Sequence, residues 1–94
     1  MWRVVRKRLA AEQRRRLSPL KKQIAALETT LEKLQAQNAE VEVRLADSAL
    51  YEDSRKAVLK SLLLDQQALK ANIDRTEEEW LVCHETLEQL GAAN

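Results

Sequence analysis

Residues 17–45 decide the fold, and they read LSPLKKQIAALETTLEKLQAQNAEVEVRL. Apolar side chains recur in this stretch at alternating steps of three and four residues, with one polar member. This spacing is the heptad pattern of a helix that packs against another helix along a narrow seam. After Leu17, the seam positions are Leu20, Ile24, Leu27, Leu31, Leu34, Asn38, Val41 and Leu45.

A second heptad seam follows a short interruption. Residues 47–53 break the pattern with Asp and Ser side chains that form local hydrogen bonds with the backbone. The steps of three and four then resume, and Gly91 after the last seam residue indicates a helix end. The second seam consists of Leu59, Leu62, Gln66, Leu69, Ile73, Thr76, Trp80, Cys83, Leu87 and Leu90.

Two seams joined by a short loop predict an all-α fold, a two-helix antiparallel coiled-coil hairpin. We expect helices at about 19–46 and 53–90, within a hairpin domain of residues 19–94. Ser18 and Pro19 favour a helix start or a kink at this point. Residues 1–18 are therefore expected to form a basic, kinked N-terminal extension or linker, helical from about Val5 onward.

The pairing register has two alternatives. If the turn centres near Leu50, facing residues have numbers that add to about 100, and Leu20 faces Trp80. If Leu50 and Tyr51 fold inward, the numbers add to about 107, and Leu20 faces Leu87. We favour the second register because it pairs apolar residues with apolar residues. The expected hairpin tip is formed by Asp47, Leu50 and Tyr51.

The composition of the 94 residues excludes several other classes of protein. One Gly and one Pro cannot supply the turns of a β-sheet, and one Cys cannot form an internal disulfide. A chain this short with 33% charged residues cannot enclose a deep catalytic pocket. It has no Gly-rich phosphate loop, and its single His lacks a partner set for a catalytic triad. We therefore expect no enzymatic activity and no cofactor or metal, with Cys83 packed in the seam and His84 solvated.

Charge is distributed unevenly along the chain. The first 22 residues contain nine basic and one acidic side chain, a formal charge of +8. The other 72 contain seven basic and fourteen acidic side chains, a formal charge of −7, so the net charge is only +1. Basic side chains along a helix can bind phosphates in a salt-dependent way. The candidate nucleic-acid-binding residues are Arg6, Lys7, Arg8, Arg14, Arg15, Arg16, Lys21 and Lys22.

Two alternatives to nucleic-acid binding remain open. The basic end can instead form surface ion pairs with acidic residues of the second helix, namely Glu77, Glu78, Glu79, Glu85 and Glu88. The off-seam residues Leu63, Leu64 and Leu81 can meet a partner, which would make the chain a purely structural protein–protein interaction or dimerisation module with weak self-association. No apolar run approaches the ~20 residues of a membrane span, so we expect no membrane partner.

Particular residues carry a family resemblance. They are the segments 24–28 and 31–32, the stretch 45–57 with its Leu-Ala-Asp tip and following Leu-Tyr, and Glu79-Trp80 with Leu87. In these features the sequence resembles the C-terminal coiled-coil domain of ABC-F family ATPases, across roughly residues 12–90. It is most similar to the YheS-like branch and also resembles Uup-like members.

The resemblance implies a parent protein with two ATP-binding cassettes that acts on the ribosome in translation in the cytoplasm. In the Uup type the hairpin is associated with DNA binding. No cassette motif is present in this sequence, so ATP and Mg²⁺ are expected only in the missing cassettes. The expected function is that of a non-catalytic C-terminal accessory domain whose basic end binds ribosomal RNA or DNA, with the parent cassettes as further partners.

Overall fold

The structure is a computed structural model that describes residues 2–92, and it describes side-chain exposure for residues 6–91. Two long helices dominate it: α1 is Trp2–Leu45, with 44 residues, and α2 is Lys56–Ala92, with 37 residues. The short 3₁₀ helices η1 (Ser48–Tyr51) and η2 (Asp53–Arg55) lie between them. Residues 2–92 contain no β-strand, and the predicted all-helical class with two long helices is confirmed.

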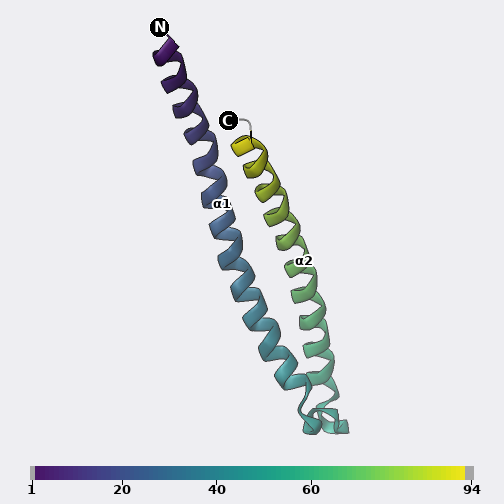
Figure 1. The fold of residues 1–94 in the computed structure, drawn as a ribbon. Helices are drawn as coiled ribbons and strands as arrows, with labels where there is room; N and C mark the ends of the chain where they lie inside the picture. Colours follow the sequence, from purple (N-terminus) through teal and green to yellow (C-terminus); the bar gives the residue numbers. More distant parts are fainter. Residues whose placement is uncertain (1, 93–94) are drawn as a thin grey trace.

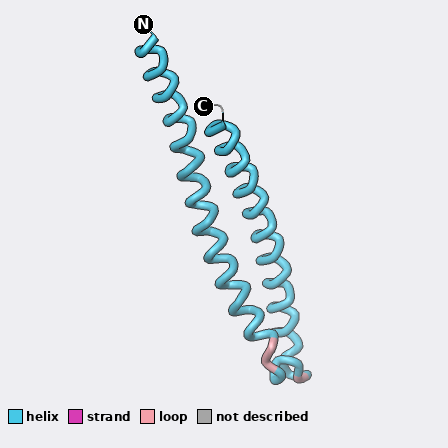
Figure 2. Tube along the Cα trace, in the orientation of Figure 1, coloured by secondary structure: helices cyan, strands magenta, loops and turns pink. Residues whose placement is uncertain are grey.

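The two long helices lie side by side, and the chain reverses direction between them (Figure 1). The only loop segments in the described part of the chain lie at this reversal (Figure 2). The molecule is a rod with extents of 79 × 15 × 14 Å. α1 is the longer helix, and its N-terminal end projects beyond the end of α2 (Figure 1).

α1 passes through Pro19 without interruption. The alternative of a helix start near residue 19 is therefore wrong, and the expectation that the chain is helical from about Val5 onward is confirmed, because residues 2–18 belong to the same helix as residues 19–45. A proline inside a helix removes one backbone hydrogen bond and crowds the preceding turn. Burial of seam residues on both sides, Leu17 and Leu20, offsets this cost. The predicted ranges 1–18 and 19–94 also include Met1 and residues 93–94, which lie outside the described residues.

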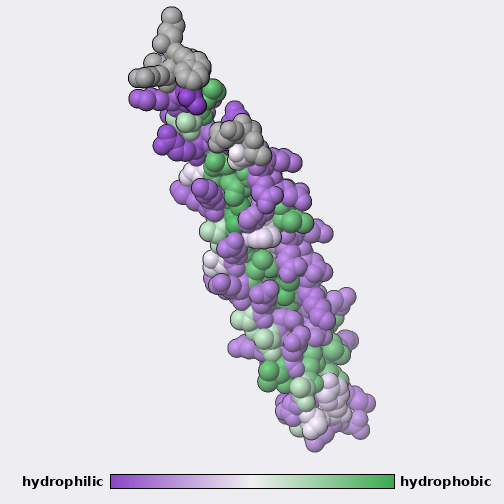
Figure 3. Space-filling model, viewed as in Figure 1, coloured by the Kyte–Doolittle hydropathy of each residue, from purple (hydrophilic) through white to green (hydrophobic). Residues whose placement is uncertain are grey.

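The seam residues of both helices lie at the helix contact. Every seam position from Leu17 to Leu90 is buried or half-buried, whereas most residues between them are exposed. The most buried members are Ile24, Leu62, Cys83 and Thr76, with exposed fractions of 3–8%. Apolar surface accordingly gathers along the line where the helices meet, with hydrophilic surface on either side of it (Figure 3). Burial along this line is the main source of stability, because a rod this thin has no other interior.

Asn38 places a polar side chain in the α1 seam. Its Nδ2 donates a hydrogen bond to Glu42 Oε1 at 3.3 Å. Its Oδ1 is buried and has no hydrogen-bond partner among the described residues. A buried unpaired carbonyl lowers stability, so Asn38 weakens the seam where an apolar residue would strengthen it.

One contact between the helices discriminates between the two registers. Trp80 Nε1 donates a hydrogen bond to Glu28 Oε1 at 3.1 Å. The numbers of these two residues add to 108, which agrees with the register of about 107 and not with that of about 100.

The tip is closed by local hydrogen bonds and one buried leucine. Asp47 Oδ1 accepts a hydrogen bond from the Ala49 backbone N–H at 3.1 Å, and Leu50 is 4% exposed. Tyr51 differs from the expectation that it folds inward, because it is 59% exposed. Its hydroxyl donates to the Leu45 carbonyl at 2.7 Å, which ties the tip to the end of α1. α2 begins at Lys56 instead of residue 53, because residues 53–55 form η2.

Candidate nucleic-acid interface

The eight candidate cations all lie on the exposed surface of α1. Six of them form adjacent pairs that recur every seven residues, a repeat of almost two helical turns or about 10.5 Å. Residues seven apart lie on the same side of a helix, so the three pairs share one face. We call these six residues the cationic face: Lys7, Arg8, Arg14, Arg15, Lys21 and Lys22.

Helical geometry places the other two candidates elsewhere. Arg16 follows Arg14 by two residues, a rotation of about 200°, so it lies on another side of α1. Arg6 also lies off the cationic face, because it stands fourteen residues before Leu20 and so continues the line of the α1 seam. The structure thus brings six of the eight predicted residues together.

A shallow groove of about 490 Å³ runs within the cationic face. It is lined by Arg14, Leu17, Ser18, Lys21, Lys22 and Ala25. Its cations stand beside short or apolar side chains that leave room between them. Such a groove allows a phosphate chain to approach the helix surface with cations on both sides.

The cationic face has no carboxylate partners within the described structure. None of its six cations forms an ion pair with a described side chain; the one ion pair found there joins Lys56 to Asp53 at 3.5 Å. Arg14 Nε donates only to the Ala10 carbonyl in the preceding turn, at 3.4 Å. Among the described residues, no ion pair joins these six cations to Glu77, Glu78, Glu79, Glu85 or Glu88, and those glutamates are exposed.

The end of α2 lies against the cationic segment. Gln13 Nε2 donates a hydrogen bond to the Leu90 carbonyl in the last turns of α2. This contact places Arg14 and Arg15 beside the last turns of α2. α2 ends at Ala92, two residues after Leu90, whereas Lys7 and Arg8 lie six and five residues before Gln13, so they lie on the part of α1 that projects beyond α2. The cationic face therefore begins on the free end of α1 and continues onto the helix pair.

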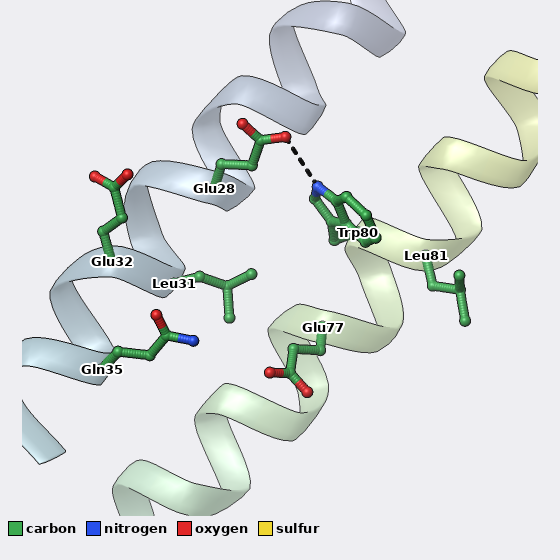
Figure 4. Close-up of a pocket in the computed structure, with 7 residues that line it drawn as sticks. All are labelled: Glu28, Leu31, Glu32, Gln35, Glu77, Trp80 and Leu81. Atoms are coloured by element: carbon green, nitrogen blue, oxygen red, sulfur yellow. Dashed lines mark hydrogen bonds between the residues drawn. The ribbon is translucent and has the colours of Figure 1, made fainter.

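A second cluster, of opposite charge, lies nearer the middle of the rod. We call it the acidic groove, an open groove of about 570 Å³ lined by Glu28, Leu31, Glu32, Gln35, Glu77, Trp80 and Leu81 (Figure 4). The hydrogen bond from Trp80 to Glu28 crosses it from α2 to α1. The groove combines an apolar floor with three carboxylates, so it is suited to a partner that is both apolar and basic.

Sequence reasoning did not identify the seven-residue repeat of the cation pairs or the acidic groove, although the sequence contains a signal for each. The cation pairs repeat with the seven-residue period of the seam itself, which is visible in the sequence. The contact of Trp80 with Glu28 follows from the favoured register, which places them almost opposite each other. The acidic groove also depends on the rotation of both helices about their axes, which the sequence pattern defines only coarsely.

Cys83 and His84 are adjacent in the sequence but differ in burial. Cys83 is 7% exposed in the seam. The expectation that His84 is solvated is wrong, because it is half-buried and its ring centroid lies 4.3 Å from that of Trp80. Within the described residues, no three His, Cys, Asp or Glu side chains gather in a way that would hold a metal ion.

The fold and this surface define an all-helical, two-helix chain with a basic end. Three curated proteins match it, all described as "Probable ATP-binding protein YheS". Those from Escherichia coli K12 and O157:H7 are each 46% identical over 52 residues, and that from strain O6:H1 is 45% identical. The match confirms the predicted resemblance to a YheS-like ATP-binding protein.

The match covers 55% of this chain but only 8% of those proteins, so the chain corresponds to a small part of their length. No family model matches the chain, and no solved structure matches it. Among the described residues, no helix is long and apolar enough to cross a membrane.

Proposed function

We propose that this chain is an antiparallel coiled-coil hairpin that acts as a non-catalytic accessory domain of an ABC-F-type ATPase in the cytoplasm. It binds nucleic acid, ribosomal RNA or DNA, through its cationic face. The likeness to YheS supports the ATPase context, because that protein is described as ATP-binding. ATP and Mg²⁺ belong to other parts of the parent protein.

One observation carries the nucleic-acid proposal. Six cations share one face of α1, and none of them forms an ion pair with a described carboxylate. Like charges held this close on a helix repel each other, which a bound polyanion would relieve. A polyphosphate chain would also release counterions as each cation binds, and this release favours association.

The geometry suits binding that ignores base sequence. Three cation pairs at steps of about 10.5 Å can follow a phosphate backbone along a straight helix. Arg and Lys can donate to guanine, but reading adenine or cytosine in the major groove uses Asn, Gln or carboxylate side chains. The cationic face offers Arg and Lys with Ser18 between them, so phosphate contacts dominate.

Salt titration tests the proposal directly. Fluorescence anisotropy would measure the affinity for a labelled rRNA hairpin, a DNA duplex and single-stranded DNA over a range of KCl concentrations. Each phosphate contact contributes a slope of about −0.9 for a DNA duplex and about −0.7 for a single strand. Six contacts therefore predict a slope of log K against log salt of about −5 for the duplex and about −4 for single-stranded DNA.

A matched pair of variants separates the cationic face from net charge. Substituting Arg14 and Arg15 by Ala should reduce the slope by about two units. Substituting Lys33 and Arg44 by Ala removes the same charge from exposed positions elsewhere on α1 and should leave the slope unchanged. A salt-independent affinity, or equal losses in the two variants, would overturn the proposal.

A further inference from the structure

A second line of side chains runs along α2, beside the seam and at steps of three and four residues. It extends over about 48 Å, and helical geometry places its members on one face. All of them are exposed. We call this line the α2 flank: Lys56, Lys60, Leu63, Gln67, Lys70, Asp74, Glu77, Leu81, Glu85 and Glu88.

The charges of the α2 flank are divided between its two halves. In the half nearer the tip, all charged residues of the line are lysines, and in the other half all charged residues are carboxylates. Each half contains one exposed leucine, Leu63 at 49% and Leu81 at 52%. If a second copy of the line is laid against the first in the opposite direction with Asn72 on Asn72, Lys56 meets Glu88, Lys70 meets Asp74 and Leu63 meets Leu81. Lys60 then falls within one residue of Glu85, and Gln67 meets Glu77.

Two grooves lie along this same flank. One, which we call the lysine groove, has a volume of about 270 Å³ and is lined by Lys56, Leu59, Lys60, Leu63, Leu64 and Gln67. The other is the acidic groove, which contains Glu77 and Leu81. Both have leucine side chains in their linings, and the charged residues around them are opposite in sign.

We propose that the α2 flank is the interface of a dimer of two copies of this chain, with their α2 helices antiparallel. Leu81 of each copy lies in the lysine groove of the other, against Leu63. The acidic ends meet the basic ends, with Lys56 facing Glu88, Lys60 facing Glu85 and Lys70 facing Asp74. A two-fold axis near Asn72 makes every contact occur twice.

The charge order selects this orientation. In a parallel pair, Lys56 would face Lys56 and Glu88 would face Glu88, and such like-charge contacts destabilise the pair. Only the antiparallel arrangement brings the lysine groove onto the acidic groove. The α2 flank lacks any residue of the cationic face, so this proposal does not depend on nucleic-acid binding.

Cysteine cross-linking tests the interface and its orientation. In a Cys83→Ala background, one chain would carry Leu63→Cys and another Leu81→Cys. An equimolar mixture should form a disulfide-linked dimer under mild oxidation, and each variant alone should form much less. Cross-linking of Leu63→Cys with itself would indicate a parallel pair and would overturn the proposal, as would no cross-linking in the mixture.

Charge reversal gives a second test with a built-in control. Lys60→Glu alone and Glu85→Lys alone should each raise the dimer Kd at least threefold in sedimentation equilibrium, and the double variant should recover the original Kd. Lys33→Glu and Glu40→Lys change exposed charges of α1 and should have no effect.

The apolar contact is tested in the same assay. Leu81→Ser should raise the dimer Kd at least tenfold, because the substitution removes apolar burial at two symmetric positions. The circular dichroism of the dilute variant should be unchanged, since Leu81 is half exposed in the single chain. A wild-type chain that stays monomeric at hundreds of micromolar would sink the dimer proposal and leave the salt titration with nucleic acid unaffected.

Discussion

Arg14 and Arg16 are two positions apart, and this small separation decides their expected roles. Arg14 lines the groove of the cationic face together with Lys21 and Lys22, whereas Arg16 does not line it. In the sequence they belong to one arginine run, so composition alone assigns them the same function. Helical rotation separates them.

Single substitutions at these two positions make a residue-level prediction. Arg14→Ala should reduce the salt slope of nucleic-acid binding by about one unit, because one phosphate contact is lost. Arg16→Ala removes the same charge from another side of α1 and should leave the slope within error of the wild type. Anisotropy titrations of both variants in parallel provide the measurement. Identical slopes for the two variants would mean that binding follows net charge and not the cationic face.

Asn38 supports a second prediction at this scale. Asn38→Leu replaces a buried unpaired Oδ1 with apolar surface and should raise the free energy of unfolding by about 1–2 kcal/mol. Urea unfolding at low protein concentration would measure the change. Gln37→Leu, at an exposed neighbouring position, serves as the control and should change stability by less than about 0.5 kcal/mol. If Asn38→Leu instead lowers the free energy of unfolding, the asparagine stabilises the seam more than a leucine at this position would.

At the scale of elements, the heptad spacing predicts both long helices and their buried sides, because burial at every third or fourth position requires a helix. Local signals were less reliable. Ser18 and Pro19 favour a helix start, yet α1 continues through them because Leu17 and Leu20 are packed on either side. The expectation that Tyr51 lies inward was also wrong, because its hydroxyl donates a hydrogen bond to the Leu45 carbonyl while the residue stays exposed. Tertiary packing and single hydrogen bonds decide such points, and sequence patterns do not encode them well.

Pro19 yields a prediction about α1 as a whole. Pro19→Ala restores a backbone hydrogen bond and removes a clash in the helix interior, a gain of up to about 3 kcal/mol. The greater freedom of the unfolded chain subtracts about 1 kcal/mol or less, so a net increase of about 2 kcal/mol in unfolding free energy is expected. Urea unfolding followed by circular dichroism would check it, with Ser18→Ala as the neighbouring control. No gain, or a loss, would indicate that α1 already accommodates the proline at little cost.

At the scale of the whole molecule, the rod has one line of buried side chains and two outer surfaces that differ in charge pattern: the cationic face holds one sign of charge and the α2 flank holds both. The cationic face lies at the end where α1 projects, and the α2 flank extends from the tip toward that end. In the proposed dimer the two-fold axis near Asn72 sends the cationic faces to opposite ends of the particle. Nucleic-acid binding and self-association then use separate surfaces and are compatible with each other.

A concentration series tests this arrangement in the intact chain. If folding is coupled to dimer formation, the midpoint of thermal unfolding should rise with protein concentration, because mass action favours the associated native state. The Leu81→Ser variant should show a much smaller rise over the same range. Added salt should reduce the rise of the unfolding midpoint with protein concentration, because salt screens the six cation–carboxylate contacts that cross the proposed interface. A wild-type midpoint that is independent of concentration would contradict the coupling.

The slender shape also has a mechanical consequence. A body 79 Å long and only 15 Å wide acts as a lever when one end is anchored. Any small rotation at an anchored cationic face is converted into a displacement of the tip that grows in proportion to the distance between them. Leu50, buried at the tip, and the Tyr51 hydrogen bond keep that far end compact, so the displacement would be delivered by a defined surface.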